Sequence, residues 1–326
     1  MMQPAEDDDD DVFVYMGGDQ QVPDGVRRAK IHISVKIVRA RAFKDRRQLI
    51  YVEFHDGVEI VEEEAFYCCR SLRSVKLLGV KIIKELAFFC SGLTDVEFGD
   101  KLETIESQAF NCCSSLSKIR IPTVRTIGAY AFAYCHGLSD VEFGERLIAL
   151  PEKTFNDCDN LKRIALPLKS GLIRDDVFKK CPKLTTVDLV GGVHNTVASL
   201  HMESWRDVMM GEINRINEEL PTISGGMTFP FDDWRKTVAV QQWMESTVHL
   251  LDECKDEHHK ILKEATMLLE LALWKANLGD NEGGRLEREG VRTTRGSRKR
   301  ARKEICVTSG ADVVIKNVLP FLQLLE

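Results

Sequence analysis

The sequence predicts an α/β repeat protein, in which a solenoid of about seven units with stacked short parallel strands precedes a helical carboxy-terminal region. Three observations predict this fold. An Ala-Phe or related pair recurs every 22 to 23 residues, apolar residues follow each phenylalanine at fixed offsets, and helical periodicity replaces this pattern after residue 190. A constant period of this length is typical of solenoids whose units bury one face against the next.

Each unit is expected to form one turn of the solenoid that carries one short strand. The phenylalanine is followed by a leucine and then by the alternation LxxVxF, which is typical of a half-buried strand. The preceding segment, xxAFxxC, has room only for a turn or a short helical piece. The phenylalanines are therefore expected to form the repeat core, which comprises Phe66, Phe88, Phe110, Phe132, Phe155 and Phe178.

The pattern IxxxAFxxCxxLxxVxF, which recurs over residues 35–190, resembles the BspA-like leucine-rich repeats of the type common in microbial eukaryotes. The resemblance implies a right-handed leucine-rich-repeat solenoid, a role in binding other proteins, and no catalytic residues shared across the family. The chain departs from the pattern in places: Arg46 replaces the usual cysteine, and one residue is missing between Phe88 and Cys90. These departures affect single units and leave the expected fold unchanged.

The repeat cysteines are expected to pack as one column along the solenoid. A column parallel to the axis cannot surround an ion as the four ligands of a zinc site do. Ten cysteines in 326 residues are also too few for a disulfide scaffold. We therefore expect reduced thiols, no metal and no cofactor, while Cys68 and Cys112 beside the column are candidates for redox sensitivity. The column comprises Cys69, Cys90, Cys113, Cys135, Cys158 and Cys181.

Polar residues on the predicted strands form a candidate protein-binding face. Two interpretations are open. Opposite charges on adjacent strands can pair laterally and fix the strand register, which we favour, or the banded charges can bind a protein. The face lacks the single-sign basic stripe that a phosphate backbone requires, so nucleic acid is not an expected ligand. The candidate residues are Tyr51, Glu53, Lys76, Asp95, Glu97, Lys118, Arg120, Asp140, Glu142 and Arg163.

The composition divides the chain into eight segments. The long amphipathic helix among them is expected to fold back on another segment or to form a coiled coil, which would make the chain a homo-oligomer. The segments are an acidic disordered tail (1–11), an amino-terminal cap (12–34), the solenoid (35–190), a capping helix (191–220), a linker (221–230), the long helix (231–278), a basic flexible loop (279–304) and a docking helix (305–326).

The basic loop contains a candidate nuclear-import signal. Its cations follow Gly296 and Ser297, a context that an importin could read. In an alternative interpretation, the chain is a nuclear factor that contacts nucleic acid through residues 296–304. No aromatic residue lies between the cations, which argues against single-strand binding by stacking. The candidate residues are Arg298, Lys299, Arg300, Arg302 and Lys303.

The sequence does not predict an enzyme. It contains none of the short motifs of nucleotide-binding proteins, serine hydrolases or zinc proteases. It also has no signal-peptide pattern and no apolar run of about 18 residues, so we expect an intracellular protein, cytoplasmic or nuclear, without a membrane partner. The leading prediction is a scaffold whose solenoid face binds an unknown protein, with carboxy-terminal helices for self-association or a second partner.

Overall fold

The computed structural model describes residues 12–190, 203–223 and 234–286. The chain divides into two compact units near His249. The first contains the solenoid and the elements that follow it up to His249, and the second begins at Leu250 and is described by itself. The candidate import signal at 298–303, the acidic tail at 1–11 and the docking helix at 305–326 lie outside the described residues.

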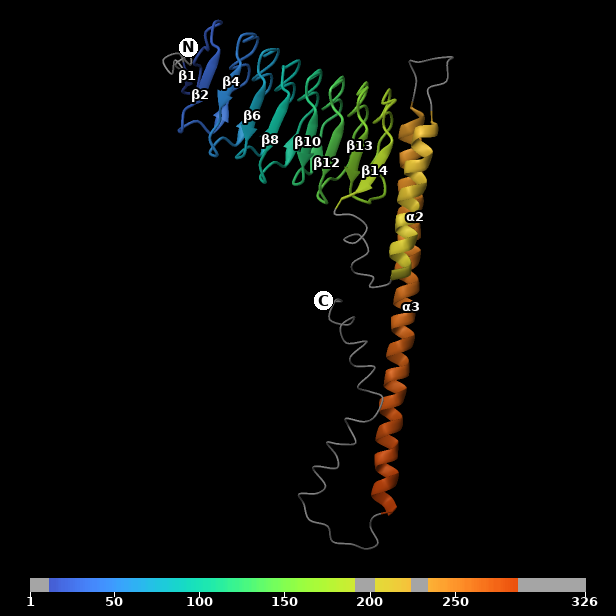
Figure 1. Ribbon diagram of the computed structural model, residues 1–326. Helices are drawn as coiled ribbons and strands as arrows, with labels where there is room; N and C mark the ends of the chain where they lie inside the picture. Colours follow the sequence, from blue (N-terminus) through green and yellow to red (C-terminus); the bar gives the residue numbers. More distant parts are fainter. Residues whose placement is uncertain (1–11, 191–202, 224–233, 287–326) are drawn as a thin grey trace, which may run out of the picture. The chain divides into compact units, whose positions relative to one another are not determined.

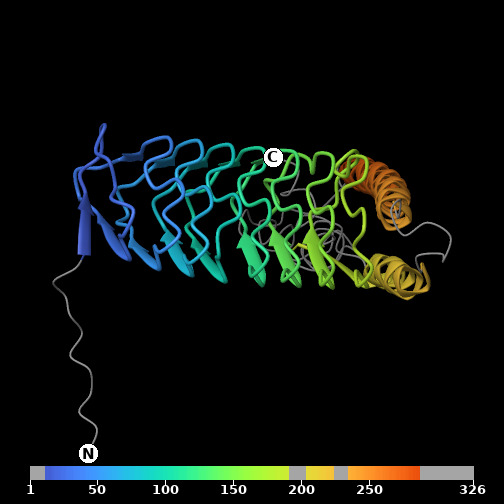
Figure 2. The same cartoon turned by 90° about the horizontal axis from the view of Figure 1, so that it is seen from above.

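Two rows of parallel strands form the solenoid (Figure 1) and lie on opposite sides of it (Figure 2). The first row contains β1 (Val12–Tyr15), β2 (Arg28–Ile31), β4 (Tyr51–Glu53), β6 (Ser74–Leu77), β8 (Asp95–Phe98), β10 (Lys118–Ile121), β12 (Asp140–Phe143), β13 (Arg163–Leu166) and β14 (Thr186–Leu189). The second row contains β3 (Ile37–Val38), β5 (Ile60–Val61), β7 (Ile82–Ile83), β9 (Thr104–Ile105) and β11 (Thr126–Ile127). This arrangement confirms the predicted solenoid of stacked parallel strands. The second row was not predicted, because one strand was expected in each unit.

The repeat phenylalanines stack as one continuous row inside the solenoid. From Phe43 to Phe178, consecutive ring centroids are 4.8 to 6.1 Å apart and consecutive ring planes lie within 12° of each other. All of these rings are fully buried. Hydrogen bonds between coils hold the backbone beside the rings, as where the Phe66 N–H donates to the Ala87 carbonyl at 2.7 Å. The repeat core is therefore an aromatic column that each coil extends by one ring.

Each coil turns sharply on both sides of its phenylalanine. In the coil of Phe66, Glu64 and Cys68 both have positive φ values, of 54° and 57°. Side chains with a Cβ atom rarely adopt this left-handed conformation, which costs roughly 1–2 kcal/mol per residue. The cost is offset because both residues donate backbone hydrogen bonds to the next coil, Glu64 to the Glu85 carbonyl and Cys68 to the Phe89 carbonyl.

Two helices close the carboxy-terminal end of the solenoid. α2 (Glu203–Glu219) packs against β14, and its Asn217 Oδ1 accepts a 2.8 Å hydrogen bond from the Val187 N–H. A short 3₁₀ helix, η3 (Leu220–Thr222), follows. On α2, Ile216 is fully buried, whereas Val208 is 41% exposed.

The first turns of α3 (Arg235–Leu286) replace the missing next coil. In the preceding coil, the Phe155 N–H donates to the Val177 carbonyl at 3.0 Å. The Phe178 N–H has no further coil to meet, and Thr237 Oγ1 accepts its hydrogen bond at 2.9 Å. On the same helix face, Gln241 and Glu245 bond to backbone groups of the loop before Phe178. Backbone groups of the last coil therefore find partners in helix side chains.

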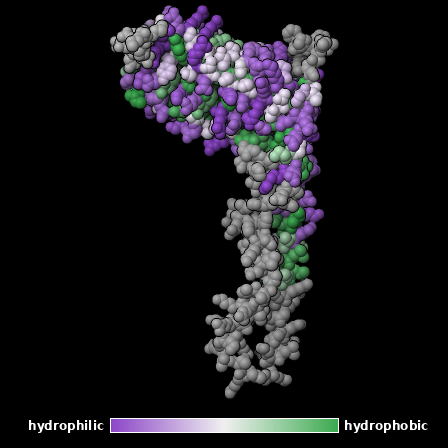
Figure 3. All heavy atoms as spheres, in the orientation of Figure 1, coloured by the Kyte–Doolittle hydropathy of each residue, from purple (hydrophilic) through white to green (hydrophobic). Residues whose placement is uncertain are grey.

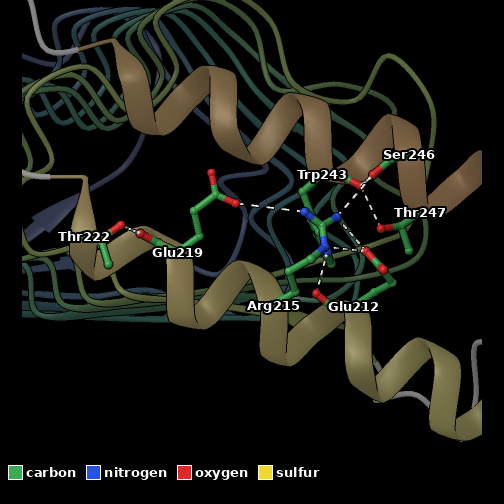
Figure 4. Close-up of polar contacts among 7 residues, drawn as sticks. All are labelled: Glu212, Arg215, Glu219, Thr222, Trp243, Ser246 and Thr247. Carbon is green, nitrogen blue, oxygen red and sulfur yellow. Dashed lines mark hydrogen bonds and ion pairs between the residues drawn. The ribbon is translucent and has the colours of Figure 1, made fainter.

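A polar clasp joins α2 to α3 (Figure 4). The buried Trp243 donates its indole N–H to the Glu212 carbonyl at 2.9 Å. Arg215 pairs with the Glu212 carboxylate at 2.6 Å and donates to Ser246 Oγ at 3.5 Å. A capping role was predicted for the helix at 191–220 alone. The long helix was predicted at 231–278, but its part in closing the solenoid was not, and α3 runs to Leu286, into the segment predicted as a loop. Thr237, Gln241 and Glu245 recur every four residues, which is also the pattern of a polar helix side that faces solvent.

Beyond Leu250, α3 carries exposed apolar side chains. Leu268 is 67% exposed and Trp274 is 61% exposed. Figure 3 shows such apolar residues gathered on this part of the helix. Self-association through this helix stays a prediction. Among the described residues, no helix is both long enough and apolar enough to cross a membrane.

Candidate functional site: the charged strand face

The ten predicted face residues lie on the first row of strands and point away from the core. The strand face is defined here as the outward side of this row. Its members from β4 to β10 are exposed, while Asp140, Glu142 and Arg163 are half-buried. The intervening residues, such as Val96 and Ile119, are buried. Because of this alternation, the charged residues of neighbouring strands lie side by side on the outward face.

Lateral ion pairs connect many of the strands on this face. Lys30 pairs with Glu53 at 2.9 Å. Arg163 bridges two strands, with Asp140 at 2.9 Å and Asp188 at 2.6 Å. The register-fixing pairs of the favoured interpretation are therefore present. Exposed pairs of this kind contribute little stability, because water and salt screen them.

The strand face is interrupted between β8 and β10. In the first row, one sheet contains β1, β2, β4, β6 and β8, and another contains β10, β12, β13 and β14. Within the described chain, no strand pairing joins these two sheets. The coils stay in contact elsewhere. Phe88 and Phe110 stack at 5.1 Å, Thr104 and Thr126 pair on the opposite row, and the Ser117 N–H bonds to the neighbouring coil at 3.4 Å. The separation is therefore local to the strand face.

A groove of about 520 Å³ occupies this interruption and is called the β8–β10 groove. Phe98 lines it and is partly exposed, whereas Leu77 and Phe143 at the same repeat position are fully buried. The β8 side is acidic and the β10 side is basic. The lining residues are Asp95, Val96, Glu97, Phe98, Gly99, Asp100, Lys118, Arg120 and Pro122.

The charges on the two walls do not neutralise each other. Glu97 pairs away from the groove with Lys76 at 3.0 Å, and Arg120 pairs away from it with Glu142 at 3.4 Å. Asp95 and Lys118 occupy equivalent strand positions, and neither has an ion-pair partner among the described residues. The groove therefore combines a carboxylate and an ammonium group that have no ion-pair partner in the described part of the chain with a partly exposed aromatic ring.

A second hollow of about 460 Å³ lies nearer the amino terminus of the strand face. Arg27, Arg28, Ile50 and Tyr51 line it, and the Arg28 guanidinium carbon lies 6.0 Å from the centre of the Tyr51 ring. Tyr51 is one of the predicted face residues, whereas Arg27 and Arg28 were not predicted. They precede the first full repeat, so the alignment of units gave them no position.

The core cysteine column is present with one correction. Cys69, for example, is fully buried and donates its thiol hydrogen to the Phe43 carbonyl of the preceding coil at 3.0 Å. The assignment of Cys90 to this column was wrong. Its unit is one residue shorter before the leucine, so Ser91 takes the buried position and contacts Cys113 Sγ at 3.2 Å. The remaining members are Cys113, Cys135, Cys158 and Cys181.

One cluster in the described chain brings possible metal ligands within 4.8 Å of one another, formed by His136, Asp157 and Asp159. His136 Nδ1 lies 3.1 Å from Asp159, and Asp157 lies 3.4 Å from the Lys180 ammonium group. A cation would compete directly with that ammonium group for Asp157. We assign no metal to this cluster.

Comparisons with solved structures give several similar proteins. A leucine-rich repeat protein from Bacteroides ovatus is 28% identical, with 48% of this chain and 41% of that chain covered and a TM-score of 0.43. A leucine-rich repeat protein from T. pallidum is 22% identical, with 58% and 78% covered and a TM-score of 0.39. A leucine-rich cell surface protein from Faecalibacterium prausnitzii is 26% identical, with 50% and 54% covered and a TM-score of 0.32. The chain spans less than half the length of the Bacteroides ovatus protein. No curated protein matches the chain.

A family model also matches the repeats. It is described as the BspA type leucine rich repeat region, and it matches in six copies over residues 25–139 and 105–204. These ranges together cover more than half of the chain and include every strand from β2 to β14. The chain belongs to the BspA type leucine-rich repeat family.

Proposed function

We propose that this chain is a non-catalytic scaffold that holds a partner protein on its strand face, centred on the β8–β10 groove. The observation that supports this most is the interruption of the strand pairing at a point where Asp95 and Lys118 have no ion-pair partner within residues 12–190, 203–223 and 234–286. Elsewhere on the strand face, many charged side chains already form ion pairs with residues of neighbouring strands. At the groove, a partner protein can therefore bind Asp95 and Lys118 without breaking an ion pair that the described residues form.

The chemistry of the groove favours a segment of protein over a nucleic acid. One wall offers carboxylates and the other offers Lys118 and Arg120, so a ligand must present both charges. A phosphate backbone carries only negative charge and would face Asp95 and Asp100 without compensation. Phe98 adds a partly exposed ring, to which an apolar side chain can pack. A protein segment with neighbouring basic, acidic and apolar residues meets these requirements.

Charge reversal at Lys118 tests the proposal. We expect Lys118→Glu to reduce recovery of the partner by about tenfold or more, because it removes one favourable pair and adds repulsion. Arg125→Glu is the matched control, since Arg125 is exposed in the same coil beside the second strand row. The full chain is purified from its native cells with and without nuclease, and the bound proteins are quantified by mass spectrometry.

The outcomes separate the candidate functions. A partner that survives nuclease, is lost with Lys118→Glu and is kept with Arg125→Glu supports the scaffold. Equal recovery with both variants would show that the groove is not the binding site. Partners that disappear with nuclease would instead support the alternative, a nuclear factor acting through residues 296–304.

A further inference from the structure

Three cysteines outside the core column form a second row, called the outer cysteine row. Cys68, Cys90 and Cys112 each lie two residues after the phenylalanine of their coil, and their φ values are 57°, 51° and 61°. The Cys68 N–H donates to the Phe89 carbonyl at 2.8 Å, and the Cys90 N–H donates to the Asn111 carbonyl at 2.9 Å. Each acceptor directly precedes the next cysteine. The three cysteines are therefore stacked one coil apart.

This stacking brings the backbone into the range that a disulfide needs. Hydrogen-bonded neighbouring chains lie about 4.8 Å apart. Disulfides join residues whose Cα atoms are roughly 4.4–6.8 Å apart. The thiols of Cys90 and Cys112 are also close enough to influence each other's pKa. A disulfide between them therefore requires little movement of the coils.

The outer row is accessible where the core column is not. Cys90 and Cys112 are partly exposed, and Cys68 is 7% exposed. In contrast, members of the core column such as Cys135 are fully buried and donate to a phenylalanine carbonyl. A small oxidant in solution can reach the outer row without unfolding the solenoid.

We propose that Cys90 and Cys112 are a redox modification site that a peroxide converts into a disulfide, with Cys68 as the alternative partner of Cys90. The Cys112 thiolate attacks one peroxide oxygen, which breaks the O–O bond and gives a sulfenic acid and water after proton uptake. The Cys90 sulfur then attacks the sulfenic sulfur and displaces its oxygen as a second water. Two thiols lose two electrons and one hydrogen peroxide is reduced to two waters.

The environment of the two thiols determines which of them ionises first and how fast they are oxidised. Burial raises the pKa of Cys90 to about 12 and also raises the pKa of Cys112. The neighbouring Cys90 side chain opposes this rise in the pKa of Cys112, so Cys112 ionises first and acts as the nucleophile. Because the thiolate fraction is small at neutral pH, we expect slow oxidation whose rate rises about tenfold per pH unit. The disulfide would join the same two coils whose strands separate at the β8–β10 groove.

Peptide mapping of the oxidised full chain tests the proposal. Trypsin leaves Cys112 and Cys113 on one peptide, so the mapping uses the Cys113→Ser variant, which places at this position the residue that Ser91 provides in the preceding coil. The reduced protein is treated with hydrogen peroxide, alkylated and digested without reductant. We expect a cross-linked pair of peptides, 85–101 and 102–118, that has lost two hydrogens and separates on adding dithiothreitol. Cys135 stays unmodified until the protein is denatured.

Further variants identify the partners. Cys90→Ser should abolish intramolecular cross-linking, because it removes the middle of the row, whereas Cys68→Ser should leave the Cys90–Cys112 bond intact. If Cys90→Ser does not fold, Cys112→Ser replaces it, and the cross-link should then move to Cys68 and Cys90. Cross-linking undiminished in a folded Cys90→Ser variant would overturn the proposal. Oxidation of Cys112 to sulfinic acid without any cross-link would also overturn it.

Discussion

Phe88→Ala is expected to lower the free energy of unfolding by about 3–5 kcal/mol, as large-to-small changes of buried aromatic residues do. The Phe88 ring is fully buried and stacks at 5.1 Å on both Phe66 and Phe110. Its removal leaves a cavity between two coils and breaks the aromatic column in mid-array. Because each coil is stabilised by its neighbours alone, no distant contact compensates for this loss. Urea unfolding followed by circular dichroism measures the effect.

Phe89→Ala provides the matched control one residue away. The Phe89 ring stacks on Tyr67 at 4.9 Å, but it lies outside the aromatic column and is partly exposed. Water can fill the space that its removal leaves, so we expect a clearly smaller loss than for Phe88→Ala. Equal losses for the two variants would contradict the assignment of the aromatic column as the main stabilising element.

Trp243→Ala is expected to cost about 3–5 kcal/mol and to loosen the carboxy-terminal cap. The indole ring is only 2% exposed, and its N–H bonds to the Glu212 carbonyl across the α2–α3 clasp. Its loss creates a cavity and leaves a polar group without its partner. The last coil then depends on fewer helix contacts to satisfy its backbone groups. Calorimetric unfolding of the full chain measures the change.

Trp274→Ala is the control for this prediction, because Trp274 lies on the same helix and is 61% exposed. We expect its effect on the unfolding free energy to be small, within roughly 0.5 kcal/mol. A Trp243 variant as stable as the Trp274 variant would show that α3 is not needed to close the solenoid.

The parts of the fold that repeat could be predicted from the sequence. One phenylalanine per unit and the LxxVxF alternation determine the aromatic column and the first strand row, because every copy supports the same assignment. The prediction went wrong where one copy differs. Cys90 lies three residues before Leu93, as the column cysteines lie before their leucines, and this spacing placed it in the column. It also lies two residues after Phe88, at the turn of positive φ, so Ser91 takes the buried position instead.

The β8–β10 groove could not be predicted from single-strand patterns, because it depends on pairing between coils. Pro122 follows β10 and has no N–H to donate. At the equivalent position, the Val190 N–H donates to the Leu166 carbonyl of the preceding coil at 3.0 Å. Proline therefore removes one bond that would hold β10 to β8. Pro167 follows β13 without opening the sheet there, where three residue pairs remain. The rest of the opening coincides with the shorter Phe88–Leu93 segment.

The groove itself can be tested most directly by hydrogen exchange of the free full chain, measured by mass spectrometry. Strands β12 and β13 are paired and provide the internal reference. Strand β8 stays paired with β6 and β10 with β12, so only the amides that point across the gap lack a strand partner. We expect these amides, within residues 95–98 and 118–121, to exchange clearly faster than those of the reference strands. The Phe88 and Phe110 segments, which stay stacked, should be as well protected as the reference. Equal protection of β8, β10 and the reference strands would mean that the strand face is continuous, and the proposed binding groove would not exist.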